Sequence, residues 1–209
     1  MKYKAIIFDL HGPLSDGAYL DKFWLEVLPR LYAKRNDLTV KGSKKILKNK
    51  FKEYGKNDYR YYSATHWLAL LSLKSKLRKI IKETKGGPFL FLDMLEIVKS
   101  VRRKAKTAII SSTIKEIIHI ELGRNKRYFD HVYASIDDFG IAGKPKGFYT
   151  RVSKSMGVKP KDILHIGNNI ETDVKNAKAA GFNTFFFDKK RPRREVIEEL
   201  KALLKSNEI

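Results

Sequence analysis

The chain has 209 residues, 43% of them hydrophobic, so it can bury a core and form one domain or one domain with an insertion. It contains no cysteine, which excludes disulfides, thiolate metal sites and cysteine nucleophiles. The 44 lysines and arginines outnumber the 23 aspartates and glutamates, giving a net charge of +21. Because no apolar run is long enough for a membrane span, we expect a globular cytoplasmic protein without a membrane partner.

The positive charge does not by itself identify a partner. It would attract phosphorylated metabolites, nucleic acid or acidic surfaces alike. A charge-rich proteome adapted to a hot environment explains the same composition about as well. Nucleic acid is therefore a partner that the charge allows but does not favour.

The first predicted element is a buried strand from Lys4 to Asp9. Its apolar run ends at a carboxylate, and Gly12 and Pro13 then break the pattern, which is typical of a strand that enters a loop. A lone carboxylate in the run Ile-Ile-Phe-Asp-Leu is unfavourable unless it has a partner. The alternative, an aspartate that only caps a turn, is therefore the weaker interpretation of Asp9.

Residues 15–87 are predicted to be wholly helical. The Ser15-Asp16-Gly17 step would act as a hinge at the start, and Gly86-Gly87-Pro88 would break the chain at the end. The segment holds 18 basic and 7 acidic residues, so it should present a basic surface. Its aromatic residues could stack on bases, but aromatics at helical spacing more often pack helices together. The predicted helices are Leu20–Tyr32, Lys44–Tyr54, Tyr59–Leu73 and Leu77–Lys85.

From about residue 88 the pattern alternates between helix and strand. Such alternation predicts an α/β fold, a Rossmann-like, doubly wound parallel sheet, with residues 1–14 and 88–209 as the core domain and 15–87 as an inserted all-helical domain. In such sheets ligands bind at the carboxyl ends of the strands. The predicted helices are Leu90–Arg103, Lys115–Leu122, Gly147–Met156, Glu171–Ala180 and Arg194–Lys205. The predicted strands are Thr107–Ile110, His131–Ala134, Ile163–Ile166 and Thr184–Phe187.

The segment Phe8-Asp9-Leu10-His11-Gly12-Pro13-Leu14 resembles the first motif of the haloacid dehalogenase superfamily, which in its phosphatases reads Asp-x-Asp-Gly-Thr/Val-Leu. The resemblance implies that Asp9 is a nucleophile. It also places His11 where the family has its general acid and base, and Pro13 where it has Thr or Val. His11 could replace that aspartate as acid and base or mark a degenerate site, and we leave both readings open.

Three later segments resemble the other motifs in the same order. The run from Ala108 to Ser111 is similar to the second motif, and Gly143-Lys144-Pro145 to the third. The segment from Gly167 through Asn168 to Asp173 is similar to the fourth, with Asn168 in place of an aspartate. The family also has a class with a helical cap after the first motif, which is where residues 15–87 lie.

The resemblance implies a magnesium-dependent phosphomonoester phosphatase that forms an aspartyl-phosphate on Asp9. Ser111, together with Ser112, and Lys144 would bind the phosphoryl group, and Lys144 would neutralise its charge. The Mg²⁺ ligands would be Asp9, the His11 carbonyl, Asn168 and Asp173, and the substrate would be a phosphorylated small molecule. Independently of the family, a carboxylate that attacks phosphorus needs cations and N–H groups around it, and Mg²⁺ prefers oxygen ligands.

Other interpretations of these residues and of the whole chain remain open. Ser111 and Ser112 could be caps for a helix that begins at Thr113, and Lys144 could be one more surface lysine. A metal-independent dehalogenase-like hydrolase is an alternative function, with Arg35 and Asn168-Asn169 as loose matches. A non-catalytic protein that uses a basic cap to hold nucleic acid is another.

Overall fold

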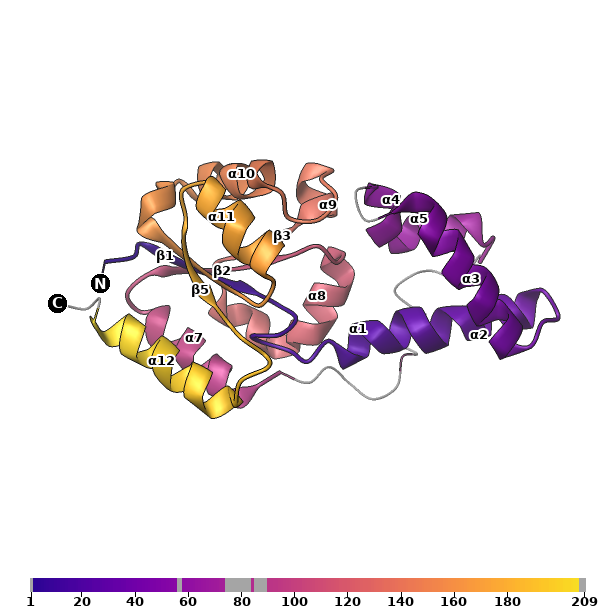
Figure 1. Ribbon diagram of the computed structural model, residues 1–209, viewed down its shortest axis with the longest axis horizontal. Helices are drawn as coiled ribbons and strands as arrows, with labels where there is room; N and C mark the ends of the chain where they lie inside the picture. The colour runs from indigo at the N-terminus through magenta and orange to yellow at the C-terminus, as the bar shows by residue number, and fades with distance from the viewer. Residues whose placement is uncertain (1, 56–57, 74–83, 85–89, 207–209) are drawn as a thin grey trace.

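Five parallel strands form the sheet at the centre of the protein, in the order β3-β2-β1-β4-β5. The computed structural model describes residues 2–55, 58–73, 84 and 90–206 (Figure 1). This order puts β1 in the middle, where both neighbours pair with it. The predicted doubly wound sheet is confirmed. The strands are β1 (Ala5–Asp9), β2 (Lys106–Ser111), β3 (His131–Ala134), β4 (Ile163–Gly167) and β5 (Asn183–Phe186).

Side chains of β1 alternate between two hydrophobic clusters, one on each face of the sheet. Ile6 and Phe8 belong to the cluster that includes residues of α7 (Leu92–Val101) and α12 (Arg193–Ser206). Ala5 and Ile7 belong to the cluster on the opposite face, with residues of α10 (Lys146–Met156). Because a strand that is buried on both faces is apolar at every position, β1 appears in the sequence as a continuous apolar run.

Helices cover both faces of the sheet (Figure 1). The helix α7 begins two residues later and ends two residues earlier than its prediction, whereas α8 has the predicted bounds. The strand β5 begins and ends one residue earlier than predicted. The predicted helix Glu171–Ala180 consists of a π-helical turn followed by a short α-helix. The helices are α7 (Leu92–Val101), α8 (Lys115–Leu122), η2 (Gly123–Tyr128), α9 (Ser135–Phe139), α10 (Lys146–Met156), η3 (Pro160–Asp162), η4 (Ile170–Lys175), α11 (Asn176–Ala179) and α12 (Arg193–Ser206).

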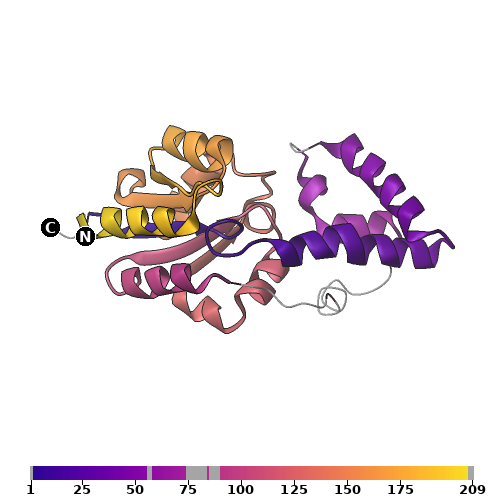
Figure 2. The same cartoon turned by 60° about the horizontal axis from the view of Figure 1, so that its bottom comes forward.

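A second group of helices, here named the helical layer, lies beyond the end of the sheet at which β1 leads into α1 (Figures 1 and 2). Its core contains Phe23, Leu28, Leu47 and Trp67, and it packs onto Ile117 of α8. The layer comprises α1 (Ala18–Lys22), η1 (Phe23–Val27), α2 (Leu28–Arg35), α3 (Val40–Tyr54), α4 (Tyr59–Tyr62) and α5 (Ala64–Leu70).

The helical layer differs from the sequence prediction at two breaks and at the start of α3, which begins at Val40 rather than at Lys44. The helix predicted over Leu20–Tyr32 contains the π-helical turn η1, and Ser63 splits the one predicted over Tyr59–Leu73. Ser63 has an extended backbone, and its hydroxyl accepts a hydrogen bond from the His66 N–H, so it caps α5. The helix predicted over Leu77–Lys85 and the breaker at 86–88 lie almost entirely outside the described residues. No helix among the described residues is long and apolar enough to cross a membrane.

Two short chain segments that connect the sheet to the helical layer lie side by side. The Leu10–Ser15 segment folds back on itself through hydrogen bonds from the Ser15 N–H to the Leu10 carbonyl, at 2.9 Å, and from the Gly12 N–H to the Ser15 carbonyl, at 2.6 Å. On the return path Ser15 forms an antiparallel bridge with Leu90, and the Phe91 N–H donates to the Leu14 carbonyl at 2.9 Å. The segment that follows Asp9 is therefore fixed at both ends.

Candidate active site

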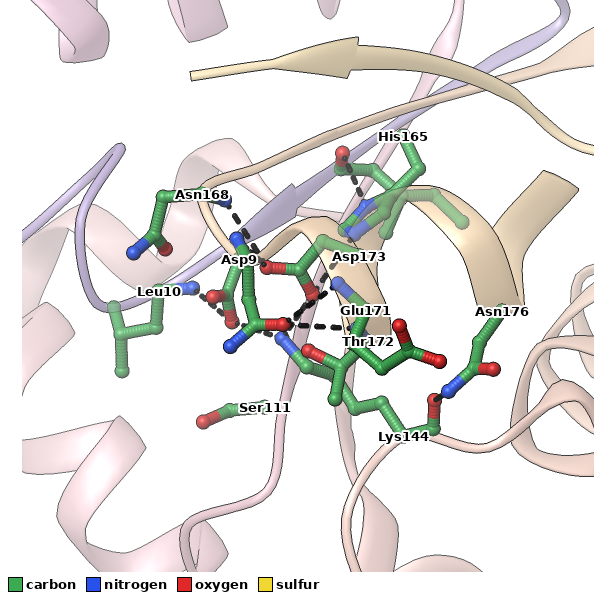
Figure 3. Close-up of polar contacts among 12 residues, drawn as sticks. Asp9, Leu10, Ser111, Lys144, His165, Asn168, Glu171, Thr172, Asp173 and Asn176 are labelled. Carbon is green, nitrogen blue, oxygen red and sulfur yellow. Dashed lines mark hydrogen bonds and ion pairs between the residues drawn. The ribbon is translucent and has the colours of Figure 1, made fainter. Parts of the chain in front are cut away.

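Asp9 is the last residue of the central strand, and its side chain lies at the carboxyl end of the sheet (Figure 3). Its neighbour in β2 is Ile110, one residue before Ser111, and β4 ends at Gly167 on the other side. The parallel register thus brings together the ends of β1, β2 and β4. The Asp9 side chain is only 11% exposed, and its Oδ1 accepts a hydrogen bond from the Leu10 N–H at 3.0 Å.

Lys144 bridges the two buried carboxylates of the site. Its Nζ lies 2.8 Å from Asp9 Oδ1 and 2.5 Å from Asp173 Oδ1. The backbone of Lys144 is fixed as well, because the Asn176 side-chain amide donates to its carbonyl at 3.0 Å. The lysine is 6% exposed, which rules out the interpretation that it is one more solvated surface lysine.

Burial and charge act against each other at these three groups. Burial raises the pKa of Asp9, and the nearby Lys144 ammonium offsets only part of this effect. Burial also favours neutral Asp173, but Lys144 and His165 outweigh it and hold the pKa of Asp173 well below its usual range. Burial would lower the pKa of Lys144, yet Asp9 and Asp173 together raise it. Lys144 therefore remains a cation beside the anionic Asp173.

Asp173 also shapes the loop that precedes its own helix. Its Oδ2 accepts the backbone N–H groups of Asn168 and Asn169 at 3.1 and 2.9 Å. A Cβ atom at Gly167 would lie only 2.5 Å from the Asp173 side chain, so the close approach requires glycine. Asn169 then caps η4 by accepting the N–H groups of Glu171 and Thr172.

The Asn168 side chain lies between the loop after β1 and Asp9. One terminal atom of its amide lies 2.7 Å from the His11 carbonyl oxygen and 3.3 Å from Asp9 Oδ2. Gly12, with φ +114°, passes so close that a Cβ atom there would come within 2.5 Å of the amide. Asp9 Oδ2, the His11 carbonyl and Asn168 thus form a cluster on the side of Asp9 away from Lys144.

The His11 ring takes a different direction from the His11 carbonyl. Its Nε2 lies 3.0 and 3.1 Å from the two carboxylate oxygens of Glu121 in α8, and the Glu121 side chain is fully buried. A buried carboxylate requires such a partner. Sequence reasoning missed Glu121, although its place beside Leu122 on a helix with a buried apolar face was a usable signal.

Two further residues support Asp173 and were not predicted from the sequence. His165 in β4 is fully buried, with Nδ1 3.2 Å from the Ile7 carbonyl and Nε2 3.4 Å from Asp173 Oδ1. The Tyr149 hydroxyl donates to the Thr172 carbonyl at 2.8 Å. Burial, and then the charges of Asp173 and Asp9, raise the pKa of Tyr149 well above its usual value, so its hydroxyl remains a donor.

Ser111 and Ser112 follow β2 at the same end of the sheet. Ser111 is 2% exposed, and its hydroxyl accepts the Thr113 N–H at 3.2 Å; Ser112 is half-buried. The helix α8 begins at Lys115, as predicted, and not at Thr113, and Ile114 is its N-cap residue. Ser111 therefore stabilises the turn after β2 and does not cap α8.

The cluster of Asp9 Oδ2, the His11 carbonyl and Asn168 has the spacing that a hard cation requires, but it carries only one negative charge. Mg²⁺ binds oxygen at about 2.0–2.1 Å in an octahedron, so adjacent ligands lie about 3 Å apart. The terminal atom of Asn168 is 2.7 and 3.3 Å from the other two oxygens. Among the described residues, no three histidine and carboxylate side chains could together hold a metal ion. A cation here would bind one carboxylate, Asp9, and two neutral oxygens.

Comparisons with known proteins identify the family and the fold of the chain. The chain matches the haloacid dehalogenase-like hydrolase family over residues 3–181. A haloacid dehalogenase-type phosphatase from Thermococcus onnurineus superposes with a TM-score of 0.77 at 20% identity, covering 96% of this chain and 97% of that one. A haloacid dehalogenase-like hydrolase from Xanthomonas campestris gives 0.60 at 14% identity, covering 99% and 94%. No curated protein matches the chain in sequence.

A third similar structure was solved with bound ligands. It is a family enzyme from Bacteroides thetaiotaomicron in complex with magnesium and inorganic phosphate, with a TM-score of 0.58, 14% identity and coverage of 88% and 93%. The fold and the family match together define a hydrolase whose core is a Rossmann-like sheet covered by helices. The chain belongs to the haloacid dehalogenase-like hydrolases.

Proposed function

We propose that the protein is a phosphomonoester phosphatase in which Asp9 is the nucleophile. The observation that carries this proposal is the pairing of the buried Asp9 with Lys144, at 2.8 Å, at the carboxyl end of the central strand. A carboxylate that attacks a phosphate ester must approach negative oxygens, and a fixed ammonium group beside it lowers that repulsion. The related phosphatase and the related complex with phosphate give further support.

In this mechanism an Asp9 oxygen attacks phosphorus, the bond to the leaving alcohol breaks, and an aspartyl-phosphate forms. Water then attacks the phosphorus of this intermediate and releases inorganic phosphate and free Asp9. Lys144 neutralises charge between Asp9 and the phosphoryl group, and the Ser111 hydroxyl, with Ser112, binds phosphoryl oxygens. Asp173 acts by holding Lys144, at 2.5 Å, and the loop that carries Asn168.

Asp9 Oδ2, the His11 carbonyl and Asn168 would hold a magnesium ion, with Asp173 fixing the loop beside them. Bound Mg²⁺ would stabilise negative charge on the phosphoryl oxygens. We further propose that residues 15–87 form a cap over residues 1–14 and 88–209, and that a phosphorylated small molecule in the cytoplasm is the substrate. The comparisons give no support to a nucleic-acid partner.

The test is hydrolysis of an aryl phosphate and an alkyl phosphate by the purified protein, with and without Mg²⁺, beside an Asp9→Asn control. We expect turnover of the aryl ester that the control lacks, because a phenolate leaves without being protonated. Similar rates for the alkyl ester would show that a group in the site protonates the leaving alkoxide, whereas selective loss of that rate would show that no group, His11 included, serves as that acid. Absence of turnover above the control for both esters would refute the proposal.

A further inference from the structure

The carbonyl oxygen and the NH₂ group of the Asn168 amide are nearly equal in size, but the oxygen accepts hydrogen bonds and the NH₂ group donates them. The end that faces the site lies 2.7 Å from the His11 carbonyl oxygen and 3.3 Å from Asp9 Oδ2, and both of these atoms are acceptors. With the amide nitrogen in this place, Asn168 donates a hydrogen bond to each. With the oxygen there, three acceptors converge, and a cation between them relieves the repulsion.

From this geometry we propose that the hydrogens of the Asn168 amide take over the role of the cation when no cation is bound. In the metal-free protein the NH₂ group faces inward and bridges Asp9 to the His11 carbonyl. When a cation binds, the amide turns over and presents its oxygen as a ligand. This inference rests on the magnesium site of the proposed function. It adds a metal-free state of that site, in which the NH₂ group of Asn168 faces inward.

The packing around Asn168 allows such a rotation but no large displacement. The amide lies against Gly12, and the Asn168 backbone N–H is held by Asp173 Oδ2 at 3.1 Å. The terminal O and NH₂ groups exchange places by rotation about χ2, which is soft for an amide and has a roughly two-fold profile. The backbone and the other side chains therefore need not change.

Asp9 is consequently engaged on both oxygens without a metal. Its Oδ1 is paired with Lys144 at 2.8 Å and accepts the Leu10 N–H, while its Oδ2 accepts from Asn168. An aspartate at position 168 could not do the same, because an ionised carboxylate has no hydrogen to donate. The metal-free wild type should therefore be well ordered, and its affinity for a divalent cation should be low.

The experiment compares Asn168→Asp with Asn169→Asp by titration calorimetry with Mg²⁺ and by melting temperature in chelator and in Mg²⁺. Asn169 is a matched control, because it is exposed and uses its side-chain oxygen to accept the N–H groups of Glu171 and Thr172. Aspartate keeps that cap and adds the same charge one residue away. Both measurements report binding and stability, so they do not depend on turnover.

We expect the chelator to leave the melting temperature of the wild type and of Asn169→Asp unchanged. Asn168→Asp should melt lower in chelator, recover in Mg²⁺, and bind Mg²⁺ about 10–100-fold more tightly than the wild type, because it adds an anionic ligand. Equal Mg²⁺ affinity in the wild type and Asn168→Asp would overturn the proposal. So would changes in Mg²⁺ affinity and melting temperature in Asn169→Asp that equal those in Asn168→Asp.

A second variant keeps the test decisive if Asn168→Asp does not fold without metal. Asn168→Ala removes both the donor and the oxygen ligand and adds no charge. The proposal expects it to melt below the wild type in chelator and to gain nothing from Mg²⁺. A melting temperature in chelator that matches the wild type would show that the Asn168 amide forms no stabilising bridge.

Discussion

Arg193 of α12 forms a bidentate ion pair with Asp93 of α7. The Arg193 Nε lies 2.8 Å from Asp93 Oδ2, and Nη2 lies 2.8 Å from Asp93 Oδ1. The same guanidinium donates to the Pro13 carbonyl at 3.0 Å and stacks on the Phe91 ring, with its carbon 3.7 Å from the ring centre. Arg193 therefore contacts both of the segments that connect the sheet to the helical layer.

Replacing Arg193 tests whether the shape of the guanidinium matters as well as its charge. Arg193→Ala should lower the free energy of unfolding by about 2–3 kcal/mol, because it removes the paired hydrogen bonds and the ring contact together. Arg193→Lys keeps the charge without the planar fork, so about half of the loss should remain. Urea denaturation measures both changes. A lysine variant as stable as the wild type would show that the charge of Arg193, and not the shape of its guanidinium group, stabilises the protein.

The same pair should make stability depend on acidic pH. Partial burial favours neutral Asp93, but the Arg193 hydrogen bonds and charge outweigh it and lower the pKa of Asp93. A lowered pKa contributes stability above about pH 4, where the unfolded side chain is also ionised, and the contribution is lost as pH falls through the folded value. Because Asp93 is 37% exposed, we expect only about 0.5–1 kcal/mol. Melting curves of Asp93→Asn should approach those of the wild type near pH 3.

Removing Lys144 should affect stability as well as activity. Lys144→Met leaves Asp9 and Asp173 buried without their shared cation, which should destabilise the protein by about 3–5 kcal/mol at neutral pH. The double variant Lys144→Met/Asp173→Asn removes one of the two charges and should recover part of that loss. Denaturation of both variants at pH 7 checks the prediction, and a double variant less stable than the single one would contradict it.

Gly12 should tolerate no side chain, for two separate reasons. Its φ of +114° is strained for any other residue, and a Cβ atom would overlap the Asn168 amide at 2.5 Å. Gly157 is a matched control, since its φ is +64° and nothing lies within 4 Å of an added Cβ. Gly157→Ala should lower stability by about 1 kcal/mol and Gly12→Ala by at least about 3 kcal/mol. Equal losses in thermal denaturation would mean that the contact with Asn168 is unimportant.

Tyr62 of α4 should influence substrate binding. Its hydroxyl lies 4.0 Å from where a Cβ atom of Gly143 would be, beside Lys144. Burial and the neighbouring Tyr61 raise the pKa of Tyr62, and Lys144 opposes them, so the hydroxyl is a neutral donor. Tyr62→Phe should increase KM by about 3–10-fold, the value of one hydrogen bond, with little change in kcat. Tyr59→Phe, at a residue 52% exposed, is the control and should change neither constant.

The sequence predicted the sheet well because its three central strands, β1, β2 and β4, are buried on both faces. Continuous apolar runs located β1, β2, β3 and β4, while the end of β5 was misplaced by one residue. The π-helical turn η1 could not be foreseen, because its residues keep the apolar spacing of an ordinary helix. Likewise Arg193 looks like a solvent-facing charge in the sequence, and only the fold brings it to Asp93. The buried helix face that holds Glu121 does not identify His11 as its partner.

The bridge between Ser15 and Leu90 makes the helical layer an insertion at one point of the core fold. Because antiparallel partners lie about 4.5–5.5 Å apart, the chain leaves the sheet and returns to it at nearly the same point. A short turn could join the two segments without moving β1 or α7, but it would expose Ile117 of α8, which the helical layer covers. The proposed nucleophile Asp9 and the helical layer are thus parts whose sequences can change separately, as long as the contact at Ile117 is kept.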